Sequence, residues 1–108
     1  MKKNRVCLIG YVGQHLSAKQ LKNGVIRIGI RMATHHQYIN DKGKEVNTTT
    51  WHDVVAWNGA AKYAERNFVK GSKIMVEGCI EYRVFPGRDG NKKYFTRIKA
   101  EGLMNLDR

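Results

Sequence analysis

The chain has 108 residues, and its 20 Lys and Arg against 9 Asp and Glu give a formal net charge of +11. A single domain typically takes ~100–200 residues, so this length leaves little room for a second one. No apolar run reaches the ~18 residues that a membrane-spanning helix requires, and the basic start lacks the apolar region and cleavage site of a signal peptide. We therefore expect a cytoplasmic protein that does not enter membranes.

The basic residues are spread over the whole chain rather than held in a tail. A folded basic domain of this kind typically binds a polyanion, although charge alone does not separate DNA, RNA and anionic lipid. Cys7 and Cys79 each lie in an apolar run with no second cysteine nearby. This spacing predicts buried free thiols and argues against a disulfide framework or a zinc site.

The first two expected strands occupy residues 6–13 and 25–33, with a polar stretch and a turn between them. Glycines interrupt the first strand, which predicts a sharp bend. In the second strand, aliphatic residues alternate with Arg27, Gly29 and Arg31, so these three share one face. The two arginines are either solvated surface charges or phosphate ligands, with Gly29 leaving space between them.

The third expected strand, residues 46–57, follows a polar stretch at residues 35–47 that predicts a protruding hairpin. Alternation puts Trp51, Asp53 and Trp57 on one face of this strand. At ~3.3 Å per residue the two tryptophans would lie about 20 Å apart. They are either core residues or exposed rings, and the smaller side chains on the opposite face favour exposed rings.

One short helix is expected over residues 59–69, with Asn58 as its N-cap and Lys70-Gly71 at its end. Its alanines and a phenylalanine form a narrow apolar stripe, while charged residues point outward. This pattern indicates a helix that plugs a core rather than one that binds a membrane or a partner helix.

The fourth and fifth expected strands, residues 73–85 and 93–103, are joined by a glycine-rich hairpin loop, and residues 104–108 show no clear structure. Three strands, one helix and two strands follow the plan of an all-β, five-stranded OB-fold Greek-key barrel with one short helix between strands 3 and 4. Closure into a barrel would also remove exposed sheet edges. We assign residues 1–104 to the OB-fold domain and residues 105–108 to a short C-terminal end.

The sequence contains no catalytic constellation. Its acids are scattered singly, and His35-His36 lacks the regularly spaced third ligand of a metal site. The glycines around Tyr11 form only a fragment of a dinucleotide-binding fingerprint. We therefore expect neither an enzyme nor a bound metal or cofactor.

Aromatic and basic residues do form a pattern. Four aromatic residues fall where a barrel would present a groove, and basic side chains lie between them. The aromatic residues are Tyr38, Trp51, Trp57 and Phe85, and the basic ones are Arg27, Arg31, Lys42, Lys44, Arg83, Arg88, Lys92 and Lys93. Flat rings stack on the unpaired bases of single-stranded nucleic acid at ~1–3 kcal/mol each, while Lys and Arg neutralise phosphates. Duplex DNA would hide the base faces, so the pattern favours single strands. The alternative is that the aromatic residues are buried and that the basic surface has no specific ligand.

Several motifs carry a family resemblance over nearly the whole chain. In chain order they are Asn-Arg-Val-Cys-Leu-Ile-Gly-Tyr-Val-Gly at residues 4–13, Met32-Ala33-Thr34, Trp-His-Asp-Val-Val-Ala-Trp at residues 51–57, Lys70-Gly71-Ser72-Lys73, Val76-Glu77-Gly78, and Asp89-Gly90-Asn91 with Tyr94. In this order they resemble the DNA-binding domain of the bacterial single-stranded DNA-binding proteins. Each motif is weak alone, and the combination is specific.

The resemblance implies sequence-nonspecific binding of single-stranded DNA in replication, recombination and repair, at the bacterial nucleoid. It places the base-stacking positions on Tyr38, Trp51, Trp57 and Phe85. Family members are usually homotetramers, so the resemblance implies a homo-oligomer, with a tetramer favoured over a dimer, and puts His52 in the core or at a subunit contact. The phosphate candidates are Arg27, Arg31, Lys42, Lys44, Arg83 and Lys93.

Two features depart from the family pattern. Asp53 stands where the family often has a basic residue, and it would repel phosphate unless Arg27 or Arg31 neutralised it. The disordered tail with an acidic tip, through which family members recruit replication and repair proteins, has no counterpart before Arg108. We therefore expect no such recruitment, and a specialised, phage or mobile-element member would have this form.

Two other functions remain open from the residues. A primosomal or RNA-binding OB module would share the fold but stack fewer bases. An oligomeric scaffold would use its basic face to bind protein. Quenching of tryptophan fluorescence by dT oligonucleotides would separate the scaffold from a protein that binds single strands.

Overall fold

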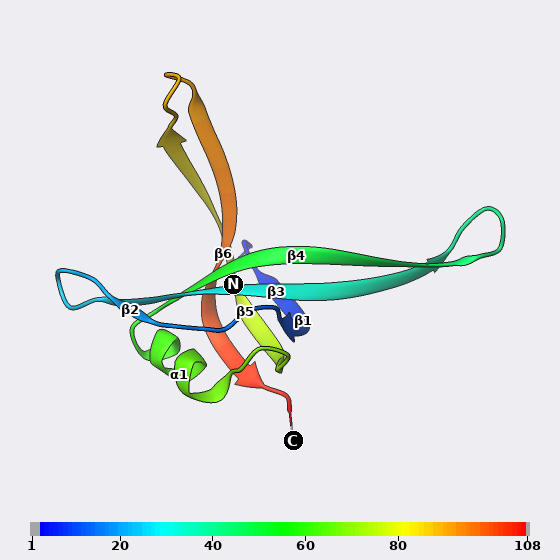
Figure 1. Cartoon of the computed structure of the whole chain (residues 1–108), viewed down its shortest axis with the longest axis horizontal. Helices are drawn as coiled ribbons and strands as arrows, with labels where there is room; N and C mark the ends of the chain where they lie inside the picture. The colour runs from blue at the N-terminus through cyan, green and yellow to red at the C-terminus, as the bar shows by residue number, and fades with distance from the viewer. Residues whose placement is uncertain (1–2, 108) are drawn as a thin grey trace.

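The computed structural model describes residues 3–107, and Figure 1 shows a small barrel from which two long hairpins project. Its elements are β1 (Val6–Val12), β2 (Lys19–Gln20), β3 (Ile26–Ile39), β4 (Glu45–Trp57), α1 (Gly59–Asn67), β5 (Lys73–Pro86) and β6 (Lys92–Asn105). Met1 and Lys2 of the basic start, and Arg108 of the expected C-terminal end, lie outside the described residues.

The sheet closes into a barrel of five strands. The strand order is β1-β5-β6-β4-β3, and β1 also pairs with β3, so the two ends of the series meet. The β4–β6 pairing is parallel, with Val54 opposite Ile98, whereas the other pairings are antiparallel. The helix lies between the third and fourth barrel strands, which confirms the expected OB-fold. Strand β2 was not expected, because its Lys19 and Gln20 are exposed and it only extends the β3 edge.

The core fills the barrel and continues onto the helix. Inward-facing residues of β3, β4 and β6 pack against one face of α1, as the predicted apolar stripe requires. The buried members of this core are Val12, Leu16, Ile28, Ile30, Met32, Val54, Ala56, Ala61, Ala64, Phe68, Ile74, Val76, Ile98 and Ala100. Burying one such aliphatic side chain contributes about 1.5–3 kcal/mol, so the barrel, rather than the hairpins, holds most of the stability.

Strand β5 is irregular in its middle. A β-bulge falls between Glu77 and Gly78, and a Cβ built on Gly78 would lie 1.9 Å from the backbone oxygen of Lys99. Glycine is therefore required at this position, because any side chain would collide with the neighbouring strand.

The two hairpins that project from the barrel are the β3–β4 arm and the β5–β6 arm (Figure 1). In the first, pairing continues to Ile39 opposite Glu45, and residues 35–39 are all exposed. The predicted protruding hairpin is confirmed, but the predicted end of the second strand at residue 33 was wrong. Residues 35–39 are exposed, so no apolar alternation marks them as a strand. Backbone pairing with β4 alone extends β3 as far as Ile39.

The helix ends two residues earlier than expected, and Asn58 is its N-cap as predicted, but without the usual side-chain bond. Asn58 adopts a positive φ of 52° and makes no capping bond with its side chain. Its Oδ1 instead accepts a hydrogen bond from the Ile26 N–H at 3.1 Å, which ties the start of the helix to β3. Gly71 follows with a φ of 92°, a left-handed conformation that glycine adopts without strain.

Among the described residues, no helix has the length and apolarity to span a bilayer.

The C-terminal segment is more ordered than expected. Met104 and Asn105 belong to β6, and the Asn105 side-chain amide donates to the Asn67 backbone oxygen at 2.5 Å. The Asp107 carboxylate accepts a hydrogen bond from the Lys73 N–H at 3.1 Å. These polar contacts hold the segment in place. They produce no apolar pattern in the sequence, so the sequence analysis did not predict this order.

The expectation of buried thiols was wrong for Cys7, which is exposed, and Cys79 is only half-buried. Cys7 lies opposite Glu77, on the outward-facing row of β1 that also includes Ile9. Both thiols are free.

Candidate nucleic-acid interface

The two tryptophans lie on the outer face of the β3–β4 pair. Arg27 is directly opposite Trp57, and Arg31 is directly opposite Asp53, two residues from Trp51. Since alternate residues of a strand project from the same face, all five side chains share this surface. Trp51 is 49% exposed and Trp57 is half-buried, so neither indole belongs to the core.

A guanidinium group accompanies each indole. The Arg31 Cζ lies 5.2 Å from the centroid of the Trp51 ring. Trp57 has two such neighbours, with the Cζ atoms of Arg27 and Arg97 at 5.8 and 5.9 Å. Cation–π contacts of this kind are worth about 0.5–1 kcal/mol at exposed sites. They place positive charge beside each flat surface on which a base would stack.

Arg97 is a site residue that the sequence analysis missed. Its Nε–H donates to Glu81 Oε1 at 3.0 Å, and the side chain is 16% exposed. Alternation in the fifth expected strand puts Arg97 on the same face as Phe95, and this shared face could have identified Arg97 as a candidate site residue. The missing information was the parallel pairing of β6 with β4, which brings Arg97 beside Trp57.

The β5–β6 arm continues this surface. Phe85 is 43% exposed and lies directly opposite Lys93, while Arg83 lies opposite Phe95. The Arg83 Cζ is 5.5 Å from the Phe85 ring, and the rings of Phe85 and Phe95 meet edge to face at 5.6 Å. By alternation these residues share their face with Arg97, so the arm surface and the tryptophan surface join at that residue.

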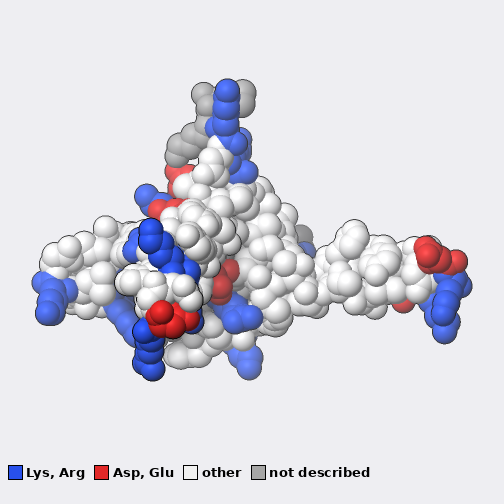
Figure 2. Space-filling model, turned by 90° about the horizontal axis from the view of Figure 1, so that it is seen from above, with Lys and Arg blue, Asp and Glu red and all other residues white. Residues whose placement is uncertain are grey.

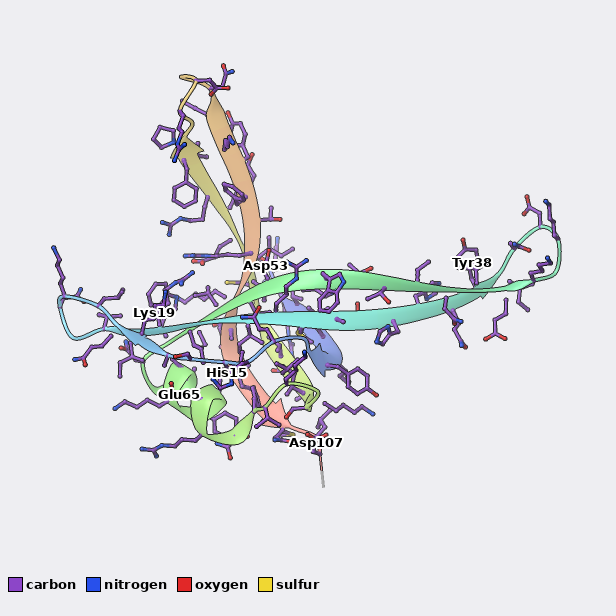
Figure 3. All side chains as sticks on the ribbon, in the orientation of Figure 1. His15, Lys19, Tyr38, Asp53, Glu65 and Asp107 are labelled. Atoms are coloured by element: carbon purple, nitrogen blue, oxygen red, sulfur yellow. The ribbon has the colours of Figure 1, made fainter. Side chains whose placement is uncertain are left out.

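The remaining three candidates lie apart from this surface. Tyr38 is 46% exposed and pairs with Val46, which puts it on the opposite face of β3–β4 from Trp51. Figure 3 shows it far along the arm from Asp53. Its ring stacks on His36, with centroids 6.0 Å apart. Lys42 and Lys44 are exposed in the loop beyond, where Figure 2 shows basic side chains beside acidic ones at the arm tip.

Two adjoining hollows share Asp53 and Arg97 in their linings. One of about 350 Å³ is lined by Trp51, Asp53, Ile80, Thr96 and Arg97, among others. The second, of about 210 Å³, contains Arg27, Gly29 and Arg31 together with the same Asp53 and Arg97. A Cβ at Gly29 would meet no atom within 4 Å, so this glycine does leave open space between the arginines.

The neutralisation of Asp53 by Arg27 or Arg31, which the sequence left open, does not take the form of an ion pair in the described part of the chain. Within residues 3–107 Asp53 forms no ion pair with Arg27 or Arg31, since both guanidinium groups lie over indole rings. Its carboxylate is exposed on the basic surface.

Two of the three histidines on the β3–β4 pair contact hydroxyl groups. His52 Nε2 lies 2.9 Å from Thr34 Oγ1, and His35 Nδ1 lies 3.1 Å from Thr49 Oγ1. His52 is half-buried on the face opposite Trp51. Residues 3–107 contain no group of three His, Cys, Asp or Glu side chains placed to hold a metal ion.

Comparison with known proteins assigns the family. The model of the Single-strand binding protein family matches residues 3–106. The chain belongs to this family. It is 32% identical over 104 residues to single-stranded DNA-binding protein 1 of Xylella fastidiosa, covering 95% of this chain and 76% of the relative. It is also 32% identical to the single-stranded DNA-binding protein of Rhizobium meliloti, covering 93% of this chain and 59% of the relative.

Solved structures share the fold. The Plasmodium falciparum SSB in its complex with ssDNA superposes with a TM-score of 0.89 at 23% identity, covering 99% of this chain and 97% of that one. The single-stranded DNA-binding protein of Thermus aquaticus, as a deletion mutant, superposes with a TM-score of 0.84 at 27% identity. That match covers 96% of this chain and 50% of the other. The predicted family resemblance is therefore confirmed.

Proposed function

We propose that this member of the single-strand binding protein family binds single-stranded DNA with little sequence preference, in replication, recombination and repair. The observation that carries the proposal is the pair of surface indoles, Trp51 and Trp57, each accompanied by guanidinium groups on one face of the barrel. Every base has a flat face, so stacking tolerates any sequence, while the arginines neutralise the backbone. The net charge of +11 attracts the polyanion over a longer range.

We assign the roles by position. Trp51, Trp57 and Phe85 form the stacking track, and Tyr38 offers a separate platform on the β3–β4 arm. Arg27, Arg31, Arg83 and Lys93 are the proposed phosphate ligands along the track, with Lys42 and Lys44 contacting phosphates at the arm tip. Arg97 joins the two halves of the track, because it contacts Trp57 and shares its face with Phe95. The binding unit comprises residues 1–104, with residues 105–108 as its C-terminal end.

The proposed assembly is a homotetramer, with a dimer as the smaller alternative. Ile9, Met75 and Met104 are neighbours in register across β1, β5 and β6. Ile9 is 53% exposed and Met104 is 49% exposed, so this apolar outer face is available to another copy of the chain. We also propose a cytoplasmic location beside the nucleoid, where single-stranded DNA becomes exposed.

A fluorescence titration with dT oligonucleotides of increasing length tests the function. We expect strong quenching of the tryptophan emission, which saturates at a defined oligonucleotide length and weakens as salt rises. Native mass measurements on the same mixtures give the oligomer number, and rU oligonucleotides compare RNA with DNA. A chain whose emission and mass do not respond to dT would not bind single strands, and the proposal would be wrong.

A further inference from the structure

Asp53 is an acid in the middle of a surface that we propose binds a polyanion. It lies between Trp51 and Trp57 on the same face of β4. At ~3.3 Å per residue, its backbone is about 7 Å from that of Trp51 and about 13 Å from that of Trp57. Removing this acid would strengthen the attraction for phosphate, so its carboxylate acts against backbone binding.

The basic residues around Asp53 have other contacts. Arg31 is directly opposite on β3, yet its guanidinium lies over Trp51. Arg97 donates to Glu81. Within residues 3–107, Asp53 has neither an ion pair nor a side-chain hydrogen bond. Both of its oxygens are therefore available to a ligand.

The hollows on either side show where such a ligand would lie. Asp53 and Arg97 line both, so they stand between the space beside Trp51 and the space beside Arg27 and Gly29. The first hollow, at about 350 Å³, is within the size range of small-molecule sites and would accommodate a base stacked on Trp51. One edge of such a base would face the Asp53 carboxylate, and its phosphate would lie on the side of Arg97, because both residues line this hollow.

We propose that Asp53 reads the edge of one base and makes that position selective for guanine. This inference rests on the proposed binding of single-stranded DNA. An ionised carboxylate only accepts hydrogen bonds. The Watson–Crick edge of guanine offers two neighbouring donors, N1–H and the N2 amine, which the two oxygens can accept side by side.

The other bases match a carboxylate less well. Cytosine and adenine each present an amine beside an acceptor nitrogen, so they form one hydrogen bond. Thymine presents a single N3–H between two carbonyl oxygens, which a carboxylate repels. Stacking on the neighbouring rings remains independent of sequence, so the preference applies to one nucleotide within the bound stretch.

The test uses the full chain and dT oligonucleotides of the shortest length that binds tightly. One internal dT is replaced in turn at each position by dG, dC or deoxyinosine, and each affinity is measured by tryptophan fluorescence. We expect dG at one position to tighten binding by about fivefold, the low end for a bidentate base contact. Deoxyinosine, which lacks the N2 amine, loses most of this gain.

Two variants locate the effect. Asp53→Asn has nearly the same shape and removes one charge from the surface. It should bind plain dT more tightly and lose the advantage of dG. Asp41→Asn removes an exposed acid from the loop of the β3–β4 arm and should retain the advantage of dG.

Two results would overturn the inference. In one, the wild-type chain binds dG, deoxyinosine and dT oligonucleotides equally, and Asp53→Asn tightens all of them by the same factor. In the other, the preference for dG persists in Asp53→Asn. Loss of binding to every oligonucleotide would instead reject the proposed function, so the two failures are distinguishable.

Discussion

The ring of Trp51 rests on the backbone of Gly13. A Cβ built on this glycine would lie 2.4 Å from Cζ3 of the indole and 2.8 Å from its Cη2. The glycine that follows β1 thus leaves the space that the ring occupies, while Arg31 lies against the same ring at 5.2 Å. The orientation of this stacking platform therefore depends on the absence of a side chain at Gly13, in the segment that follows β1.

Replacing that glycine should weaken binding without unfolding the barrel. In Gly13→Ala the new methyl group displaces the exposed indole. Losing part of one stacked base, worth ~1–3 kcal/mol in full, raises the Kd for dT by roughly fivefold. Gly59→Ala, where a Cβ meets nothing within 4 Å, is the matched control. Equal affinities for the two variants, measured by fluorescence titration and with thermal melts to check folding, would contradict the contact.

The two indoles should report DNA binding differently. Trp57→Phe leaves the emission of Trp51, which is 49% exposed, and Trp51→Phe leaves that of the half-buried Trp57. We expect deeper quenching by dT in Trp57→Phe, because the more exposed ring is freer to stack. Trp51→Ala should cost about 1–3 kcal/mol of binding free energy, and Trp51→Phe less, since a flat ring remains. An unchanged Kd for Trp51→Ala would show that this ring does not stack on a base.

Loss of one phosphate ligand should change the salt dependence of binding. Each phosphate neutralised on a single strand contributes about −0.7 to the slope of log K against log salt. Arg31→Gln should reduce the magnitude of this slope by about that amount. Lys62→Gln, on the exposed side of α1, removes the same charge and should leave the slope unchanged. Titrations at four or more salt concentrations measure both, and an equal decrease in the two variants would indicate only a general charge effect.

The loop of the β5–β6 arm should loosen in acid. Hydrogen bonds from the Asn91 backbone and then from its side chain lower the pKa of Asp89 below its ordinary value of 3.8. A lowered pKa in the folded chain means that the ionised form stabilises the loop above pH 3.8, and that this contribution disappears as pH falls through the lowered value. The amide signal of Asn91 in NMR spectra should titrate with a midpoint below pH 3.8. In Asp89→Asn the same signal should show no titration.

Periodicity in the sequence was enough to predict the barrel. The alternation of Ile28, Ile30 and Met32 with arginines identified a half-buried strand, and the structure buries all three. It also placed Trp51 and Trp57 on one face, as the register shows. Features that depend on burial are predictable in this way, because the core imposes a regular pattern on the chain.

Features set by backbone pairing or by non-local contacts were not predictable. The outer part of β3 is exposed on both faces, so it shows no apolar alternation and resembles a loop, although its residues pair as far as Ile39. Asn58 has the residue type of an N-cap, but its side chain bonds to Ile26 on another strand. Arg97 required knowledge of which strand lies beside Trp57. In each case the decisive partner is distant in the sequence, and a local pattern does not identify it.

The separation between barrel and arms has a consequence for how this chain can evolve. Residues 82–86 and 92–96 on one arm, and residues 35–39 on the other, have no buried side chain. Substitutions there change ligand contacts at little cost to stability, whereas substitutions among the packed barrel residues mostly disturb folding. Natural variants are therefore expected to diversify at the arm surfaces, where new binding preferences can arise while the scaffold is inherited unchanged.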